Sequence, residues 1–150
     1  MRIGFAFLIV AGCGYHPGSF AGRSPYAGTR STVGCLDLAI ARRSDLPDAA
    51  VLDYQFGNRC DTAVPVDFAA VAVIARTRAG ADVRLAPYDP EHAITAQRLD
   101  GRLEGREVIA YPVADEVVQI CIDTASLTHL EPSRWVCVGD RASRLAEVQP

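Results

Sequence analysis

Cysteine is the residue type whose chemistry and spacing are most informative in this sequence. The chain contains five of them: Cys13, Cys35, Cys60, Cys121 and Cys137. An odd number in an exported chain leaves one thiol over after disulfide pairing. Cys13 is set apart because it follows a short apolar run near the N-terminus. The other four form an even set, which an oxidising compartment pairs into two disulfides.

The first 13 residues have the composition of an export signal. Arg2 supplies a positive charge, the stretch from Ile3 to Val10 is apolar, and small residues follow. The sequence Val10-Ala11-Gly12-Cys13 resembles the lipobox of bacterial lipoproteins. This resemblance implies cleavage before Cys13, a thioether-linked diacylglycerol on its sulfur, and a fatty acid such as palmitate on the new amino terminus. Because Gly14 and not Asp follows the cysteine, the resemblance favours the outer membrane of the bacterial cell envelope.

The composition divides the chain into four expected segments. These are a signal peptide in 1–12, the lipidated cysteine and a flexible tether in 13–33, a β-sandwich domain in 34–140 and a polar tail in 141–150. Residues 14–33 are rich in Gly, Ser and Pro and have no periodic apolar face. A flexible tether of this length reaches roughly 25 Å. We interpret Tyr15, Phe20 and Tyr26 as scattered aromatics of this loop, free to contact the domain or the lipid.

The rest of the chain has the pattern of an all-β protein. Apolar and polar residues alternate with a period of two in short segments, as at Leu36, Leu38 and Ile40. Turn-forming residues recur between these segments, at a spacing of roughly 8–14 residues. The Ala-rich runs 45–52 and 63–75 leave a helix open there. The pattern predicts an antiparallel β-sandwich of about seven to eight strands.

One stretch also resembles a known type of sandwich. Tyr54-Gln55-Phe56-Gly57-Asn58 followed by Pro65-Val66-Asp67 is similar to a strand, Asn turn and polar strand of immunoglobulin-like domains in envelope lipoproteins. The similarity is one of pattern over residues 35–138. It therefore implies an immunoglobulin-like fold and no activity.

The predicted strands favour one of the three possible disulfide pairings. Cys35 opens one strand and Cys60 follows the end of the next, so an antiparallel hairpin brings them together. Cys121 and Cys137 lie in the last two strands and pair across them. Each bridge contributes about 3 kcal/mol in the chain-entropy description. Trp135, two residues before Cys137, is expected in the core beside that disulfide.

Candidate catalytic groups are few and scattered. His16 lies in the expected tether, and His129 lies in the loop between the last two strands. His92 has acidic neighbours in Asp89 and Glu91, which we interpret as a solvated turn and not as an acid–base cluster. The sequence contains no nucleophile-elbow motif, zinc-protease motif or phosphate-binding glycine loop. We therefore expect no catalytic site and no cofactor.

The spacing of the possible ligands also disfavours a metal. No two cysteines form a C-x₂-C unit and no histidine lies next to a cysteine, as a zinc site would require. Calcium needs six or more converging oxygens. The acidic turns lack the EF-hand spacing; they are Asp61…Asp67, Asp89…Glu91 and Asp115-Glu116. We expect no metal site.

Charge and hydropathy restrict the partners. The net charge is −3, and loss of residues 1–12 with Arg2 leaves −4, whereas nucleic-acid binding needs a concentrated basic face. Arg76-Thr77-Arg78 and Arg102…Arg106 are interpreted as solvent-facing edges. The apolar window Val64–Ala75 is too short to span a bilayer.

We expect membrane contact through the lipid, no nucleic acid, and a non-catalytic accessory or binding domain with an envelope protein partner. A small-molecule or metal-binding receptor remains the alternative, and a hydrolase is disfavoured.

Overall fold

A computed structural model describes residues 14–22, 26–43, 48–88, 96–113 and 116–139. These residues form ten strands and two short helices, in the order α1 (Pro17–Ala21), β1 (Thr29–Val33), β2 (Leu36–Arg43), β3 (Ala49–Asn58), β4 (Val64–Asp67), β5 (Ala72–Thr77), β6 (Asp82–Leu85), β7 (Ala96–Leu99), β8 (Glu104–Pro112), β9 (Val117–Asp123), η1 (Ser126–Thr128) and β10 (Trp135–Gly139). Neither helix, nor any other described segment, is a helix of the length and hydrophobicity that crossing a membrane requires.

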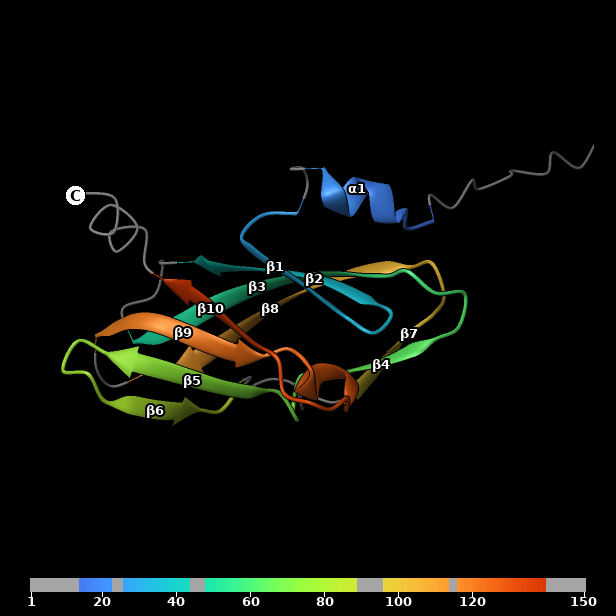
Figure 1. The fold of residues 1–150 in the computed structure, drawn as a ribbon. Helices are drawn as coiled ribbons and strands as arrows, with labels where there is room; N and C mark the ends of the chain where they lie inside the picture. The colour runs from blue at the N-terminus through green and yellow to red at the C-terminus, as the bar shows by residue number, and fades with distance from the viewer. Residues whose placement is uncertain (1–13, 23–25, 44–47, 89–95, 114–115, 140–150) are drawn as a thin grey trace, which may run out of the picture.

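Two four-stranded sheets form the two layers of the molecule (Figure 1). The first sheet has the strand order β1-β2-β3-β8 and the second has the order β10-β9-β5-β6, while β4 and β7 form a separate pair. All of these strand pairs are antiparallel. The all-β antiparallel sandwich predicted from the sequence is therefore confirmed, but the described residues form ten strands and not the seven to eight expected. The described parts of the Ala-rich runs contribute strands to it.

The core fills the space between the two sheets with one face of each strand. Leu38 and Ile40 of β2 and Leu52 and Tyr54 of β3 are inaccessible to solvent, and they belong to the same cluster as Ile120 of β9. This is the result that a period-two pattern gives, because alternate side chains of a strand point to the same face. Burial of the apolar side chains supplies the main driving force for this fold.

The two sheets approach each other along one side, where β1 lies beside β10. The hydroxyl of Thr29 donates to the carbonyl of Cys137 at 3.3 Å, and the hydroxyls of Ser31 and Thr124 lie 3.4 Å apart. The first contact joins β1 to β10, and the second joins β1 to the residue that follows β9.

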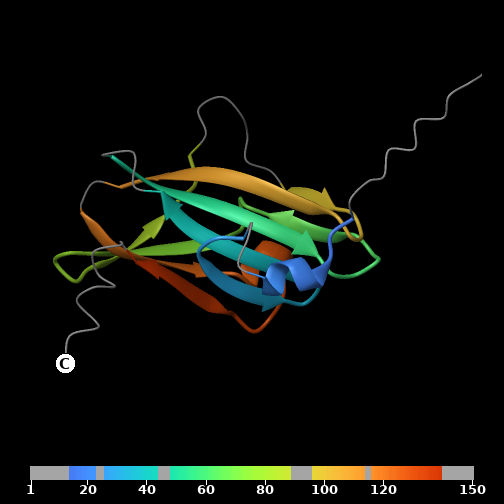
Figure 2. The ribbon, with the colours of Figure 1, turned by 90° about the horizontal axis from the view of Figure 1, so that it is seen from above.

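Residues 14–22 and 26–33 are part of the domain, which corrects the flexible tether expected for them. β1 is an edge strand of the first sheet, and Tyr15 and Tyr26 are only 2% and 4% exposed. We call residues 14–22 and 26–28 the strap, because they lie across the outer face of the first sheet, away from the second sheet (Figure 2). Small sheet residues make room for it: a Cβ on Gly57 would lie 2.3 Å from the Tyr15 ring.

Candidate functional site

Among the residues that the structure describes, His16 and His129 lie apart from each other. His16 is exposed next to α1, and Nε2 of His129 lies 3.2 Å from Oδ2 of Asp67 at the surface. Within the described ranges, no three His, Cys, Asp or Glu side chains form a group that could hold a metal ion. Other candidates from the sequence lie outside the described residues, namely Cys13, Asp89, Glu91, His92 and Asp115.

Four cysteines form two disulfides in the pairing that the sequence favours. Cys35–Cys60 joins the start of β2 to the loop after β3, with the two Cα atoms 5.4 Å apart. Cys121–Cys137 joins directly opposed residues of β9 and β10, with a Cα separation of 4.0 Å. Cys13 is thus the one cysteine of the five that these disulfides do not use.

Trp135 lies on the outer surface of the second sheet and is 45% exposed, which corrects its expected place in the core. Trp135 and Cys137 are two residues apart and share a face of β10. Val138 is buried in the core, so the face that carries the tryptophan and the disulfide points outward. The tryptophan therefore lies on the same side of the sheet as the disulfide, as expected, but in contact with solvent.

A shallow hollow of about 190 Å³ lies beside this tryptophan. We call its lining the Trp135 face, which consists of Ile74, Arg76, Asp82, Gln119, Cys121 and Trp135. The lining combines an aromatic ring, an aliphatic side chain and a disulfide sulfur with a charged pair, Arg76 and Asp82, whose atoms Nε and Oδ1 are 2.9 Å apart. The hollow is below the size that encloses a drug-sized molecule, about 300–1,000 Å³.

The strap is held on the first sheet by buried polar contacts as well as by its aromatic rings. The Tyr15 hydroxyl donates to Oδ2 of Asp37 at 2.7 Å, and the Tyr26 hydroxyl donates to Oε2 of Glu104 at 2.6 Å. Burial, followed by these hydrogen bonds to carboxylates, raises the pKa of both tyrosines above its ordinary value. Both phenols therefore remain neutral donors. The backbone N–H of Tyr15 also donates to the carbonyl of Arg102 at 2.5 Å.

A third contact fastens the middle of the strap. The guanidinium of Arg30 in β1 donates to the carbonyls of Phe20 and Tyr26, and its Cζ lies 5.3 Å from the centre of the Phe20 ring. The aromatic residues of the strap therefore help to hold it on the first sheet. In the sequence, this role is indicated only by the occurrence of three aromatic residues in a segment that is otherwise rich in Gly and Ser.

The arginines of the two expected basic edges are paired with carboxylates. Arg76 pairs with Asp82 at 2.9 Å, and Arg102 pairs with Asp61 at 2.8 Å. Arg78 pairs with Glu116 in the same way. The acidic partners neutralise these edges locally. The described surface around them is mixed in charge and does not form a basic stripe.

Asp53 is the most strongly paired carboxylate of the first sheet, and it gives a pH-dependent prediction. It is 5% exposed and accepts hydrogen bonds from Arg106 at 2.8 and 2.5 Å and from Arg43 at 3.0 and 3.2 Å. The bonds from Arg106, assisted by Arg43, hold the pKa of Asp53 below its ordinary value. We expect Asp53→Asn to lower the free energy of unfolding at pH 7 by about 1–2 kcal/mol. The loss is no larger because Arg43 and Arg106 are half-exposed, so solvent screens part of their interaction with Asp53.

The direction of the Asp53 pKa shift determines the pH range over which Asp53 stabilises the protein. A carboxyl whose pKa is depressed in the native state stabilises the protein above its unfolded pKa of about 3.9, and this stabilisation is lost as the pH falls through the native value. Urea unfolding at pH 7 and near pH 3 should therefore show a difference between wild type and variant that shrinks in acid. Asp82→Asn, in an exposed Arg–Asp pair, is the matched control and should change little. An equal loss at both pH values would contradict the assignment.

Comparisons with known proteins identify the fold. The sequence matches no protein-family model and no curated protein significantly. The yjhA protein of Bacillus subtilis is similar in structure with a TM-score of 0.52 and 9% identity, over 75% of this chain and 96% of that one. The ycdA protein of Bacillus subtilis, described as a putative lipoprotein, matches with a TM-score of 0.52 and 11% identity, over 81% of this chain and 42% of that one. At these identities the likeness concerns the fold.

Proposed function

We propose that this chain is a bacterial lipoprotein, held to the outer membrane by a lipid on Cys13, whose immunoglobulin-like sandwich is a non-catalytic binding or accessory domain. The observation that carries the proposal is the use of the cysteines. Four are consumed by two disulfides, which form in an oxidising compartment. The fifth, Cys13, is the cysteine of the lipobox Val10-Ala11-Gly12-Cys13. A fold shared with ycdA is in keeping with this role.

The Trp135 face is the surface that best fits a protein partner. Tryptophan is among the residues that most often dominate binding energy at interfaces, particularly when it lies beside a pocket. Trp135 is half exposed beside a hollow, and the Arg76–Asp82 pair supplies a polar border. The outer face of the first sheet is by contrast partly covered by the strap, through Tyr15 and Tyr26.

A site-specific photo-cross-linker in the membrane-bound protein tests this assignment. With the cross-linking amino acid at Gln119, we expect one envelope protein to be captured, and we expect Trp135→Ala to reduce that product several-fold. Gln97 on exposed β7 is the matched control position and should capture much less of the same protein. Equal capture from both positions, or capture that is indifferent to Trp135, would contradict the assignment of this face.

A small-molecule receptor is the second candidate, because one hollow has a suitable size. It measures about 340 Å³ and is lined by Tyr26, Gln55, Glu104, Gly105 and Arg106, where the strap meets β3 and β8. This volume is within the usual range of ligand pockets. A metabolite screen by thermal shift, in which Arg106→Gln abolishes the shift of any hit, would favour this function over protein binding.

A further inference from the structure

The strap determines how close the domain lies to its lipid. Tyr15 is 2% exposed and its backbone N–H is bonded to Arg102, so this residue has a fixed place on the domain. Only Gly14 separates it from Cys13. Two residues of extended chain span at most ~7 Å. A flexible tether of twenty residues would instead allow roughly 25 Å.

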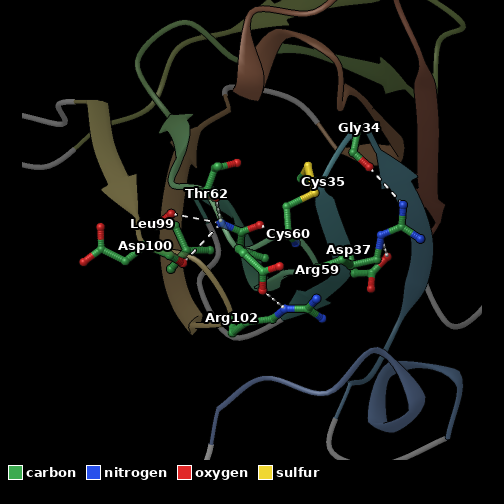
Figure 3. Close-up of a disulfide and its surroundings, with 11 residues drawn as sticks. Gly34, Cys35, Asp37, Arg59, Cys60, Thr62, Leu99, Asp100 and Arg102 are labelled. Atoms are coloured by element: carbon green, nitrogen blue, oxygen red, sulfur yellow. Dashed lines mark hydrogen bonds and ion pairs between the residues drawn. A yellow bond between two sulfur atoms is a disulfide. The ribbon is translucent and has the colours of Figure 1, made fainter.

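The place where the strap starts lies at one end of the sandwich. We call this the anchor end and define it by the turn Gly34–Cys35, the loop Arg59–Thr62 and the turn Asp100–Leu103. Figure 3 shows these segments gathered around the Cys35–Cys60 disulfide. The carbonyl of Arg102, which accepts the bond from Tyr15, belongs to the last of these turns.

Hydrogen bonds and close packing hold the loops and turns of the anchor end together. The side-chain N–H groups of Asn58 donate to the carbonyls of Thr62, Leu99 and Asp100 at 2.8–3.2 Å, and Asn58 is fully buried. Gly101 allows close packing of two turns, since a Cβ there would lie 2.1 Å from the carbonyl oxygen of Asp61. Because these contacts connect the turns of the anchor end rigidly, the strap has a fixed position relative to the rest of the domain.

The β5–β6 turn lies at the opposite end. β5 starts near η1, where the N–H of Ala72 donates to the hydroxyl of Ser126 at 3.1 Å, and η1 contacts β4 next to the anchor end. From there β5 runs along the sandwich to Thr77, and the turn that follows contains Ala79 (Figure 1).

We infer that the domain stands on the membrane by its anchor end, with the lipid headgroups of the anchoring bilayer as the occupant of that surface. The inference rests on the proposed lipid at Cys13, and the short connection through Gly14 is what selects the membrane. Leu103 and Leu130 are 48% and 45% exposed at this end and can enter the headgroup layer. Arg59 and Arg102 are half-exposed at this end, but their pairing with Asp37 and Asp61 neutralises them locally, so the leucines and the short connection determine the contact. The strands then rise from the bilayer, and the β5–β6 turn points away from it.

Tryptophan fluorescence in vesicles tests this orientation, because Trp135 is the single tryptophan of the chain. In a Trp135→Phe background of the full acylated protein, one variant carries Leu103→Trp at the anchor end and a matched variant carries Ala79→Trp at the opposite turn. Both positions are exposed. The vesicles contain phosphatidylethanolamine and phosphatidylglycerol with a headgroup nitroxide quencher. We expect quenching to be several-fold stronger at position 103 than at position 79.

Loosening the strap should remove this difference. Tyr15→Ala deletes the buried ring, and Gly57→Ala displaces it from the other side, because the new Cβ would overlap the Tyr15 ring. Each variant should bring the two quenching values closer together while the disulfides and the circular dichroism of the sheets persist. Equal quenching at both positions in acylated protein with an intact strap would overturn the orientation alone. Protein without an acyl group on Cys13 would overturn the proposed function itself.

Discussion

Replacing Cys13 with serine is expected to abolish acylation and to release the protein from the membrane fraction. A serine hydroxyl cannot form the thioether that holds the diacylglycerol. Each buried CH₂ of a lipid chain contributes about 0.8 kcal/mol to membrane binding, and two or more chains are needed for stable anchoring. Removal of the attachment point therefore removes nearly all of the membrane affinity. Fractionation, metabolic labelling with a fatty acid and intact mass measure the effect.

A matched cysteine variant separates lipidation from a general loss of thiols. Cys35→Ala with Cys60→Ala removes two cysteines of a disulfide and should keep both the fatty-acid label and the membrane association. If Cys13→Ser retained its label and its place in the membrane fraction, the lipoprotein assignment would be wrong. Some residual membrane association without label would instead reflect an uncleaved apolar segment from Ile3 to Val10.

Removal of the Cys35–Cys60 disulfide is expected to lower the stability of the domain strongly. The bridge closes a loop with a sequence separation of 25. In the chain-entropy description, such a loop corresponds to about 3 kcal/mol of unfolding free energy. We expect the double variant Cys35→Ala, Cys60→Ala to lose about this amount. Urea unfolding of the non-lipidated Cys13→Ser protein, with and without the double substitution, measures it without interference from the membrane.

The second disulfide provides the comparison. Cys121–Cys137 closes a separation of 16 and joins strands that the β9–β10 ladder already aligns. Its removal should cost a similar amount, again about 3 kcal/mol, but should leave the strap in place on the first sheet. Non-reducing peptide mapping of the wild type identifies the connectivity directly. A peptide that joins Cys35 to Cys121 would refute the pairing.

Most of the strands could be predicted from the sequence because their signal is local. In β2, Leu36, Leu38 and Ile40 alternate with more polar residues, and the structure buries these three side chains in the core. Turn residues such as Gly57-Asn58 end the strands close to where the structure ends them. A local pattern of this kind needs no knowledge of distant parts of the chain, which is why the positions of most strands along the chain and the two strand pairs that carry disulfides could be predicted.

The two features that were missed depend on residues far away in the sequence. Burial of Tyr15 requires the absence of a side chain at Gly57, and its hydroxyl needs Asp37 as a partner. Neither condition is visible within the N-terminal segment. The sequence pattern does not predict the face on which Trp135 lies, for a different reason. Both faces of β10 carry apolar residues, so alternation alone does not determine which face points inward.

The contact between β1 and β10 has a consequence for when the protein can fold. Thr29 and Cys137 are 108 positions apart, and their strands meet where the two sheets close. A contact of such long sequence separation cannot form until nearly the whole chain is available, and contacts of this type slow folding. In a chain delivered in N-to-C order, as the proposed export would deliver it, the closing strand arrives last. The two sheets can therefore close only after Cys137 has emerged, so the topology delays completion of the sandwich to the end of that delivery.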